Sequence, residues 1–245
     1  MNVIIGYGVV GQNVAKIFRD ADLHDPAKNL RAKGTYEVGF VCVPTDSKDD
    51  GAADTSIVEA VVKEWRSRCK VLCIRSTVPP GTTFGLDGPC VFSPEYYGGT
   101  QHANAVDYDF VVLGGPRHLA NIVAEQYKEV YPASLRIYYT DSTTAELVKY
   151  MENSWLATKV TFCNEFYRIA QAFNLDYDEV RELWLNDPRV NRSHTFVYRN
   201  HPYYDSHCLN KDVPAIINAS VDKGFTPEFL YAMMMRNNEF KVKME

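Results

Sequence analysis

Long apolar runs are what this sequence most plainly lacks. No stretch of the 245 residues reaches the roughly 18 consecutive apolar residues that a membrane span needs. The N-terminal sequence MNVIIGYG has no charged leader and no extended hydrophobic segment, so we expect a strand there and not a signal peptide. These absences predict a cytoplasmic protein with no membrane contact.

Basic residues are neither in excess nor clustered. The chain has 26 Lys and Arg against 31 Asp and Glu, a formal net charge of −5. Without a Lys/Arg stripe to follow a phosphate backbone, a nucleic-acid partner is not expected. Apolar residues make up 46% and charged residues 23%, which is typical of one large or two modest globular domains.

The six cysteines show no disulfide or metal pattern. Only Cys69 and Cys73 lie close together, and this C-x₃-C has no second pair that would complete a zinc site. We therefore expect reduced thiols and no metal.

A glycine-rich motif follows a short apolar strand at residues 2–5. The sequence GYGVVG fits G-x-G-x-x-G, in which glycines allow a tight turn, close approach to a pyrophosphate, and helix–strand packing. The helix that begins here would point free N–H groups at the phosphates. The predicted cofactor contacts are Gly6, Gly8, Val9, Val10 and Gly11.

A carboxylate lies at the distance that dinucleotide-binding folds use. Residues 21–25 predict a second strand that ends in Asp25, close to the roughly 20 residues expected after the first glycine. A carboxylate there accepts hydrogen bonds from a ribose diol and repels a 2′-phosphate, so NAD is predicted over NADP. The alternative is that Asp25 merely opens an Asp-Pro turn.

Further strands and helices alternate along the first half. The expected strands are residues 38–43, 71–76, 90–92, 110–113 and 135–138, with helices at 54–68 and 119–131. This alternation predicts an α/β fold with a Rossmann-like, doubly wound parallel sheet. Its ligand-binding edge would carry Pro44, Thr45, Ser76, Thr77 and Glu95. The connection from residue 25 to 38 is short for a crossover.

The second half is helical. The pattern becomes helical from Ser142, and residues 143–173, which contain no Pro or Gly, predict one long helix, capped by Ser142 or Thr143 with Glu146 completing a capping box. Lys149 and Asn153 share a face of this helix. Helices are also expected at 177–186, 213–223 and 227–241. The chain thus divides into a dinucleotide-binding domain, residues 1–141, and an all-α domain, residues 142–245.

The stretch HCLNKD places Cys208 before Lys211 and Asp212. If residues 205–211 enter the following helix, the thiol lies near a helix N-terminus and beside a cation, and both features lower a thiol pKa. The alternative is one more structural thiol, as we expect for the other five cysteines.

These motifs resemble those of the UDP-glucose/GDP-mannose dehydrogenase family, the NAD-dependent nucleotide-sugar 6-dehydrogenases. The matching stretches occur in family order over essentially the whole chain: GYGVVG, FVCVPTD, STVPPGTT, SPEYYGG, AELVKYMENSWLATKVTFCNE and CLNKD. The resemblance implies oxidation of a sugar C6 alcohol to a carboxylate with two NAD⁺, through a thiohemiacetal and a thioester on a cysteine.

The resemblance also assigns roles. Cys208 matches the nucleophile, and Asp212 matches the aspartate that works with a water in proton transfer. Lys149 and Asn153 match the groups that stabilise oxyanion charge, although Lys149 alone would be an ordinary helix charge. Glu95 matches the acid/base residue of thioester hydrolysis, or else caps a turn, and Thr77 matches the residue that positions water. Lys211 joins the cofactor-binding set, or else tunes the thiol or faces solvent.

Two departures from the family pattern stand out. The family places a glycine-rich loop close to PGxGFGGSC before its cysteine, whereas this chain has NHPYYDSHC. The family also continues into a third domain, and this sequence ends at Glu245. We expect a changed substrate, surface contributed by a partner, or lost activity.

Three functions remain open from sequence. The first is the four-electron sugar or nucleotide-sugar dehydrogenase; the second is a two-electron hydroxyacid-type dehydrogenase, which needs no cysteine. The third is a non-catalytic NAD-binding subunit of a full-length enzyme. The long helix also predicts a homodimer that buries a face containing Trp155 and Phe162.

Overall fold

The structure is a computed structural model that describes residues 1–96 and 109–242. Residues 97–99 of the SPEYYGG motif lie outside the described residues. The chain divides into two compact units, Met1–Tyr150 and Met151–Glu245.

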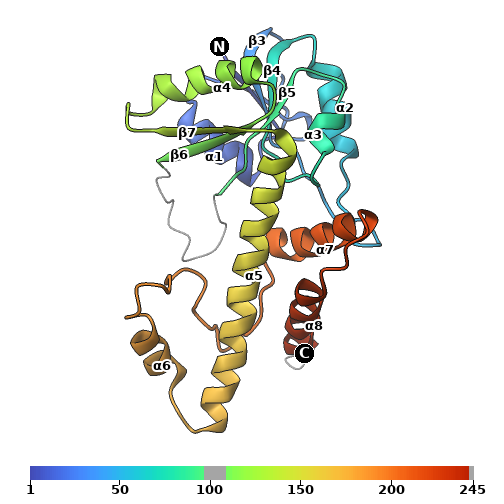
Figure 1. Cartoon of the computed structure of the whole chain (residues 1–245). Helices are drawn as coiled ribbons and strands as arrows, with labels where there is room; N and C mark the ends of the chain where they lie inside the picture. The colour runs from blue at the N-terminus through green and yellow to red at the C-terminus, as the bar shows by residue number, and fades with distance from the viewer. Residues whose placement is uncertain (97–108, 243–245) are drawn as a thin grey trace. The chain divides into compact units, whose positions relative to one another are not determined.

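A seven-stranded sheet forms the centre of the first unit (Figure 1). Its strand order is β2-β1-β3-β4-β5-β6-β7. Neighbours among β1 to β5 are parallel, β6 runs antiparallel to β5, and β7 runs parallel to β6. The predicted Rossmann-like α/β class is confirmed, with a mostly parallel sheet. The strands are β1 (Val3–Ile5), β2 (Asp22–His24), β3 (Tyr36–Val41), β4 (Cys69–Ile74), β5 (Cys90–Phe92), β6 (Phe110–Gly114) and β7 (Arg136–Thr140).

Helices cover both faces of this sheet. Successive strand residues point to opposite faces, and the apolar side chains on each face are buried by helices. Ile4 packs in a cluster with residues of α1 (Val9–Ile17) and α4 (Arg117–Val130). Its neighbours Val3 and Ile5 pack in a second cluster with α2 (Ser56–Trp65). A short helix α3 (Thr82–Gly85) precedes β5. The continuous apolar character of the central strands follows from burial on both faces.

The short connection after β2 contains only a 3₁₀ turn, η1 (Pro26–Lys28). Asp25 caps this turn, since its Oδ1 accepts a hydrogen bond from Ala27 N at 3.2 Å. The chain then returns to form β3 on the other side of β1, which leaves β2 at the edge of the sheet. Tyr36 of β3 donates a 2.7 Å hydrogen bond to Asp22 of β2.

The predicted long helix is α5 (Ser142–Ala172), which begins in the first unit and continues in the second. The expected capping arrangement is wrong. Asp141 takes the capping position instead, because its Oδ1 accepts from Thr144 N at 2.8 Å. Glu146 instead accepts hydrogen bonds from backbone N–H groups at the start of α3. The second unit also contains α6 (Tyr177–Trp184), α7 (His207–Asp222) and α8 (Glu228–Val242).

Helix α7 begins at His207, six residues before the predicted start. The predicted helix, residues 213–223, would have placed Pro214 in its first turn, where proline is favoured. In the structure Pro214 lies inside the helix, and Ser206 is the N-cap, accepting from Leu209 N at 3.3 Å. The core of the second unit combines α5, α7 and α8 through Ala157, Tyr204, Leu209, Val213, Ile217 and Met233.

Candidate active site

The glycine-rich loop between β1 and α1 leaves backbone open where a phosphate would lie. A Cβ on Gly11 would lie 2.0 Å from the carbonyl oxygen of Gly6, and Gly6 has a positive φ of 89°. A Cβ on Gly8, in contrast, would meet no protein atom within 4 Å. Gly8 is also the N-cap of α1, so its neighbours Val9 and Val10 open the helix. This geometry fits the pyrophosphate of a dinucleotide.

Asp25 joins the end of β2 to this loop. Its Oδ2 accepts a hydrogen bond from Tyr7 N at 2.9 Å, and Lys28 Nζ donates to Tyr7 O at 2.5 Å. Asp25 therefore both opens the turn and contacts the glycine loop. Each carboxylate oxygen can accept a further hydrogen bond, so the side chain remains suited to a ribose diol.

The loops after β3 and β4 are tied to one another. Thr45 is buried and its hydroxyl donates to Thr77 O at 2.8 Å, while Ser76 Oγ donates to Val43 O at 2.6 Å. Pro44 is exposed and Thr77 is half-buried. The Thr45 and Ser76 hydroxyls thus fix the carboxyl edge of the sheet, and Thr77 is placed at that edge.

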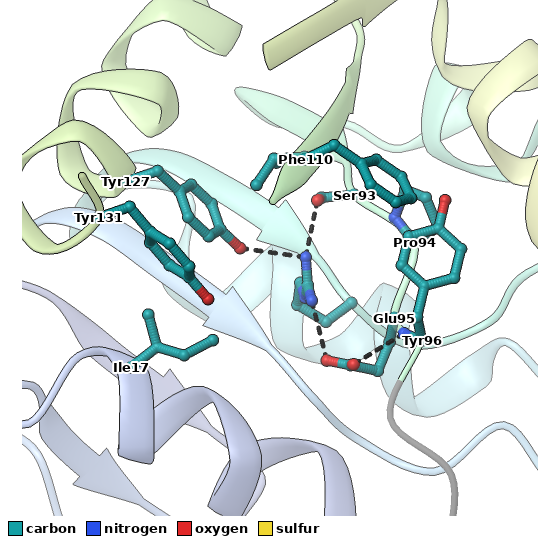
Figure 2. Close-up of a pocket in the computed structure, with 10 residues that line it drawn as sticks. Ile17, Ser93, Pro94, Glu95, Tyr96, Phe110, Tyr127 and Tyr131 are labelled. Atoms are coloured by element: carbon teal, nitrogen blue, oxygen red, sulfur yellow. Dashed lines mark hydrogen bonds and ion pairs between the residues drawn. The ribbon is translucent and has the colours of Figure 1, made fainter. Parts of the chain in front are cut away.

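Glu95 lies in a buried network that Figure 2 shows. Its Oε2 forms an ion pair with Arg75 Nη2 at 2.8 Å, and its Oε1 accepts from Tyr96 N at 2.8 Å. Arg75 Nη1 also donates to Ser93 Oγ at 2.7 Å and to Tyr127 Oη at 3.1 Å. These side chains border a cavity of about 20 Å³, room for about one water molecule.

Lys149 is buried in the second turn of α5, with Nζ 5.4 Å from the centre of the Tyr96 ring. One turn earlier, Glu146 accepts hydrogen bonds from Gly81 N at 2.6 Å and Thr83 N at 2.7 Å. Burial raises the pKa of Glu146, and the hydrogen bonds from the loop oppose that shift. The start of α5 is thereby fixed to the loop that follows Thr77.

In the second unit, Asp212 is 1% exposed and accepts two hydrogen bonds. Asn153 Nδ2 donates to its Oδ2 at 2.6 Å, and Lys211 Nζ donates to its Oδ1 at 2.5 Å. Cys208 is exposed in the first turn of α7, four residues before Asp212 and so on the same face of the helix. The structure brings Asn153, Lys211 and Asp212 together, one turn from the thiol.

Side chains fill the segment that is glycine-rich in the family. Tyr204 is buried in the core, and its backbone N–H and C=O both form hydrogen bonds with the side-chain amide of Asn237 of α8. The rings of His201 and Tyr203 lie 3.9 Å apart. Asp205 accepts from Asn210 at 2.7 Å. The segment that leads into α7 therefore carries packed aromatic and polar side chains where the family pattern has glycine.

Three residues of these networks escaped the sequence reading. Arg75 was predicted only as part of the strand at residues 71–76. A single arginine at the end of an apolar strand does carry a signal, because a buried cation needs a buried acidic or polar partner. Glu146 was assigned to a local cap. Asn237, in an otherwise unremarked C-terminal helix, gave no sequence signal.

Residues 12–132 match the NAD binding domain of the UDP-glucose/GDP-mannose dehydrogenase family, and residues 143–239 match its central domain. The chain belongs to this family. The predicted resemblance and the predicted cofactor, NAD, are both confirmed, and the glycine loop and Asp25 supply a fitting site.

Relatives in this family include the GDP-mannose 6-dehydrogenase of Pseudomonas aeruginosa, which is 29% identical over 82% of this chain and 51% of its own length. The UDP-glucose 6-dehydrogenase of the same organism is 30% identical over 82% of this chain and 48% of its own length. The chain spans about half the length of these curated relatives.

Solved structures share the fold. A UDP-glucose dehydrogenase from Pyrobaculum islandicum superposes with a TM-score of 0.80 and 22% identity, covering 97% of this chain and 68% of that chain. A 3-hydroxyisobutyrate dehydrogenase from Mycobacterium tuberculosis has a TM-score of 0.71 and 12% identity, covering 98% of this chain and 93% of that chain. No helix within the described residues is long and apolar enough to cross a membrane.

Proposed function

We propose that this chain oxidises the C6 alcohol of a sugar, in the form of a nucleotide-sugar, to the carboxylate with NAD⁺ and through Cys208. The observation that carries the proposal is the polar cluster of α7. An exposed thiol in the first helical turn lies one turn from a buried carboxylate that is bonded to Asn153 and Lys211. Helix N-termini and nearby cations favour the thiolate, which is the nucleophilic form.

Bound NAD⁺ supplies the hydride acceptor for both oxidation steps. Between them, the Cys208 thiolate adds to the aldehyde carbon and the aldehyde oxygen takes a proton, which gives a thiohemiacetal. Loss of the hydride from that carbon to NAD⁺ and of the proton from its hydroxyl gives a thioester. Water then adds to the thioester carbon, the Cys208 sulfur leaves, and the carboxylate is released. Covalent capture retains the reactive aldehyde and divides a difficult oxidation into two easier steps.

The remaining residues take roles that suit their chemistry. Lys149 and Asn153 donate to oxygen as negative charge develops, and such preorganised donors are usually the largest contribution to catalysis. Asp212 accepts a proton through water. Glu95 and Thr77, both in the first unit, serve the hydrolytic step as proton acceptor and water-positioning group.

Counting NADH per sugar consumed tests the proposal. The chain is incubated with NAD⁺ and a panel of UDP-sugars, GDP-mannose and unactivated hexoses. Two NADH per sugar, lost in Cys208→Ser, is the expected result. Turnover that is unaffected by Cys208→Ser would contradict the covalent route.

One structural likeness favours a second candidate, a two-electron hydroxyacid-type dehydrogenase. The likeness to the 3-hydroxyisobutyrate dehydrogenase covers nearly the whole of both chains, although at 12% identity it concerns the fold alone. This candidate predicts one NADH per substrate and no effect of Cys208→Ser. The same assay therefore separates the two.

A homodimer through α5 is also proposed. Trp155, Phe162 and Phe166 are 59%, 47% and 42% exposed, and their spacing places them on one face of the helix. The Phe162 and Phe166 ring centres lie 4.7 Å apart, which makes a continuous apolar surface. A second copy of the same helix matches such a surface, because a two-fold interface joins identical patches.

Sedimentation velocity at micromolar concentration tests the dimer. The chain is expected to sediment as a dimer, and Trp155→Glu with Phe162→Glu is expected to give a monomer. Gln171→Glu, an exposed position on another face of α5, is the matched control. A wild-type chain that sediments only as a monomer would contradict the interface.

A further inference from the structure

We propose that Arg75 is a positioning residue that holds the Glu95 carboxylate in one orientation for the hydrolytic step. The assignment rests on the proposed function, because it gives Arg75 a role in the half of the reaction that releases product. Arg75 directly follows β4, and Glu95 is the third residue after its neighbour β5. One side chain therefore spans the ends of two adjacent strands.

The guanidinium leaves the Glu95 side chain little freedom. Oε2 is bonded to Arg75 Nη2 at 2.8 Å, while Oε1 accepts from the backbone of Tyr96 at the same distance. Arg75 is itself held by Ser93 Oγ and by Tyr127 Oη of α4 (Figure 2). The carboxylate is thus fixed at both oxygens, and the group that fixes it is fixed in turn.

Burial makes a purely structural role a poor explanation. The side chains of Arg75 and Glu95 are only 6% and 5% exposed. A buried ion pair often adds no stability compared with well-packed apolar residues of similar volume, because both charges lose their hydration. The neighbouring side chains Ile17 and Phe110 are apolar. A requirement for an oriented carboxylate explains why charge is kept here.

Arg75 also connects two of the proposed functional loops. Ser76 and Thr77 follow it directly, and Ser93 and Glu95 are its hydrogen-bonding partners. An arginine can serve these partners simultaneously because its donors form a planar fork, whereas a lysine ammonium is a single point charge. Arg75→Lys consequently keeps the buried charge while disturbing the geometry.

The test is a rapid-mixing experiment with NAD⁺ and the sugar that the wild-type chain oxidises. In Arg75→Lys, both hydride transfers should occur once at close to the wild-type rate, followed by turnover slowed about 100-fold, the typical size of a misplaced acid/base group. Intact-mass measurement should find an acyl adduct accumulating on the chain. Arg66→Lys is the matched control, because Arg66 pairs with Asp87 in the same unit but at the surface.

Tyr127→Phe provides a second variant that keeps the ion pair and removes one partner of the guanidinium. Turnover of this variant should also slow after the hydride transfers, with an accumulating acyl adduct, but by less than in Arg75→Lys. If Arg75→Lys slowed the hydride transfers as much as turnover, or slowed turnover with no acyl adduct, the role proposed for Arg75 would be contradicted. The proposed function would not be affected by that result. A wild-type chain that forms no NADH from any sugar would overturn the proposed function and this role with it.

Discussion

The side-chain amide of Asn237 forms two hydrogen bonds with the backbone of Tyr204. Its Oδ1 accepts from Tyr204 N at 2.8 Å, and its Nδ2 donates to Tyr204 O at 3.0 Å. Both residues are buried. Helix α8 thereby holds the segment that leads into α7, four residues before Cys208.

Asn237→Ala should lower the free energy of unfolding by about 2–4 kcal/mol, because it leaves a buried N–H and a buried C=O without their partner. Urea denaturation measures this loss. The exposed neighbour Asn238 provides the control, and Asn238→Ala should stay within about 0.5 kcal/mol of wild type. Equal effects of the two substitutions would contradict the account.

Glu146 predicts a specific pH dependence of stability. Burial raises its pKa above the ordinary value of 4.5, so the folded chain binds more protons than the unfolded chain between that value and the raised one. The contribution of Glu146 to stability therefore falls as the pH rises through this window. Glu146→Gln should remove that dependence.

The same substitution should cost about 1–3 kcal/mol at pH 8, because a carboxamide oxygen can satisfy only one of Gly81 N and Thr83 N while its NH₂ faces the other. Urea denaturation across pH 4–8 provides the comparison, with the exposed Glu129→Gln as control. A pH profile for Glu146→Gln that parallels the wild type would show that the carboxyl does not titrate in this range.

One thiol per native chain should react with a thiol reagent at pH 8. Cys208 is exposed, whereas the other five cysteines are buried. Burial raises the pKa of Cys73 and of Cys90 to about 12 and that of Cys69 to about 11, so these thiols stay protonated. Cys208→Ser should abolish the fast reaction, and the unfolded wild-type chain should react at all six positions. Fast labelling that survives Cys208→Ser would contradict this.

Substitutions at two glycines of the glycine-rich loop should distinguish an effect on stability from an effect on cofactor binding. An added methyl at Gly8 meets no protein atom, so Gly8→Ala should leave the melting temperature nearly unchanged. It should still weaken NAD⁺ binding at least about 10-fold, because the backbone can no longer approach the pyrophosphate closely. Isothermal titration measures the affinity.

Gly11→Ala is the contrasting variant. Its methyl would lie 2.0 Å from Gly6 O, so a shifted loop and a lower melting temperature are expected together with weaker binding. Equal thermal stability of the two variants would show that the loop tolerates side chains at both positions.

Much of the fold could be predicted from local sequence patterns. The glycine spacing, the apolar strands and the uninterrupted run of α5 depend on residues close together in the chain, and each of these elements forms close to its expected bounds. The direction in which a strand joins the sheet does not depend on its local sequence. Nothing in the sequence of residues 110–114 indicates that β6 pairs antiparallel to β5. The predicted start of α7 was six residues late, and Pro214, a residue that is common in a first helical turn, lies in the interior of this helix.

Site residues divide in the same way. Asp25 could be predicted as a site residue because its distance from the glycine loop along the chain is characteristic, and the structure shows its hydrogen bond from Tyr7 N. Arg75 and Asn237 act through partners 20 and 33 residues away. Only the folded chain brings such partners together, so a single sequence does not reveal them.

The short connection after β2 also affects how the molecule behaves at high concentration. An open sheet presents unpaired N–H and C=O groups along its outermost strand, and long, flat outermost strands invite foreign chains to extend the sheet. Here that border is the three-residue strand β2, followed at once by the η1 turn. An incoming strand would find few groups to pair with before the backbone turns away. The abbreviated crossover thus protects this side of the protein from strand-by-strand aggregation.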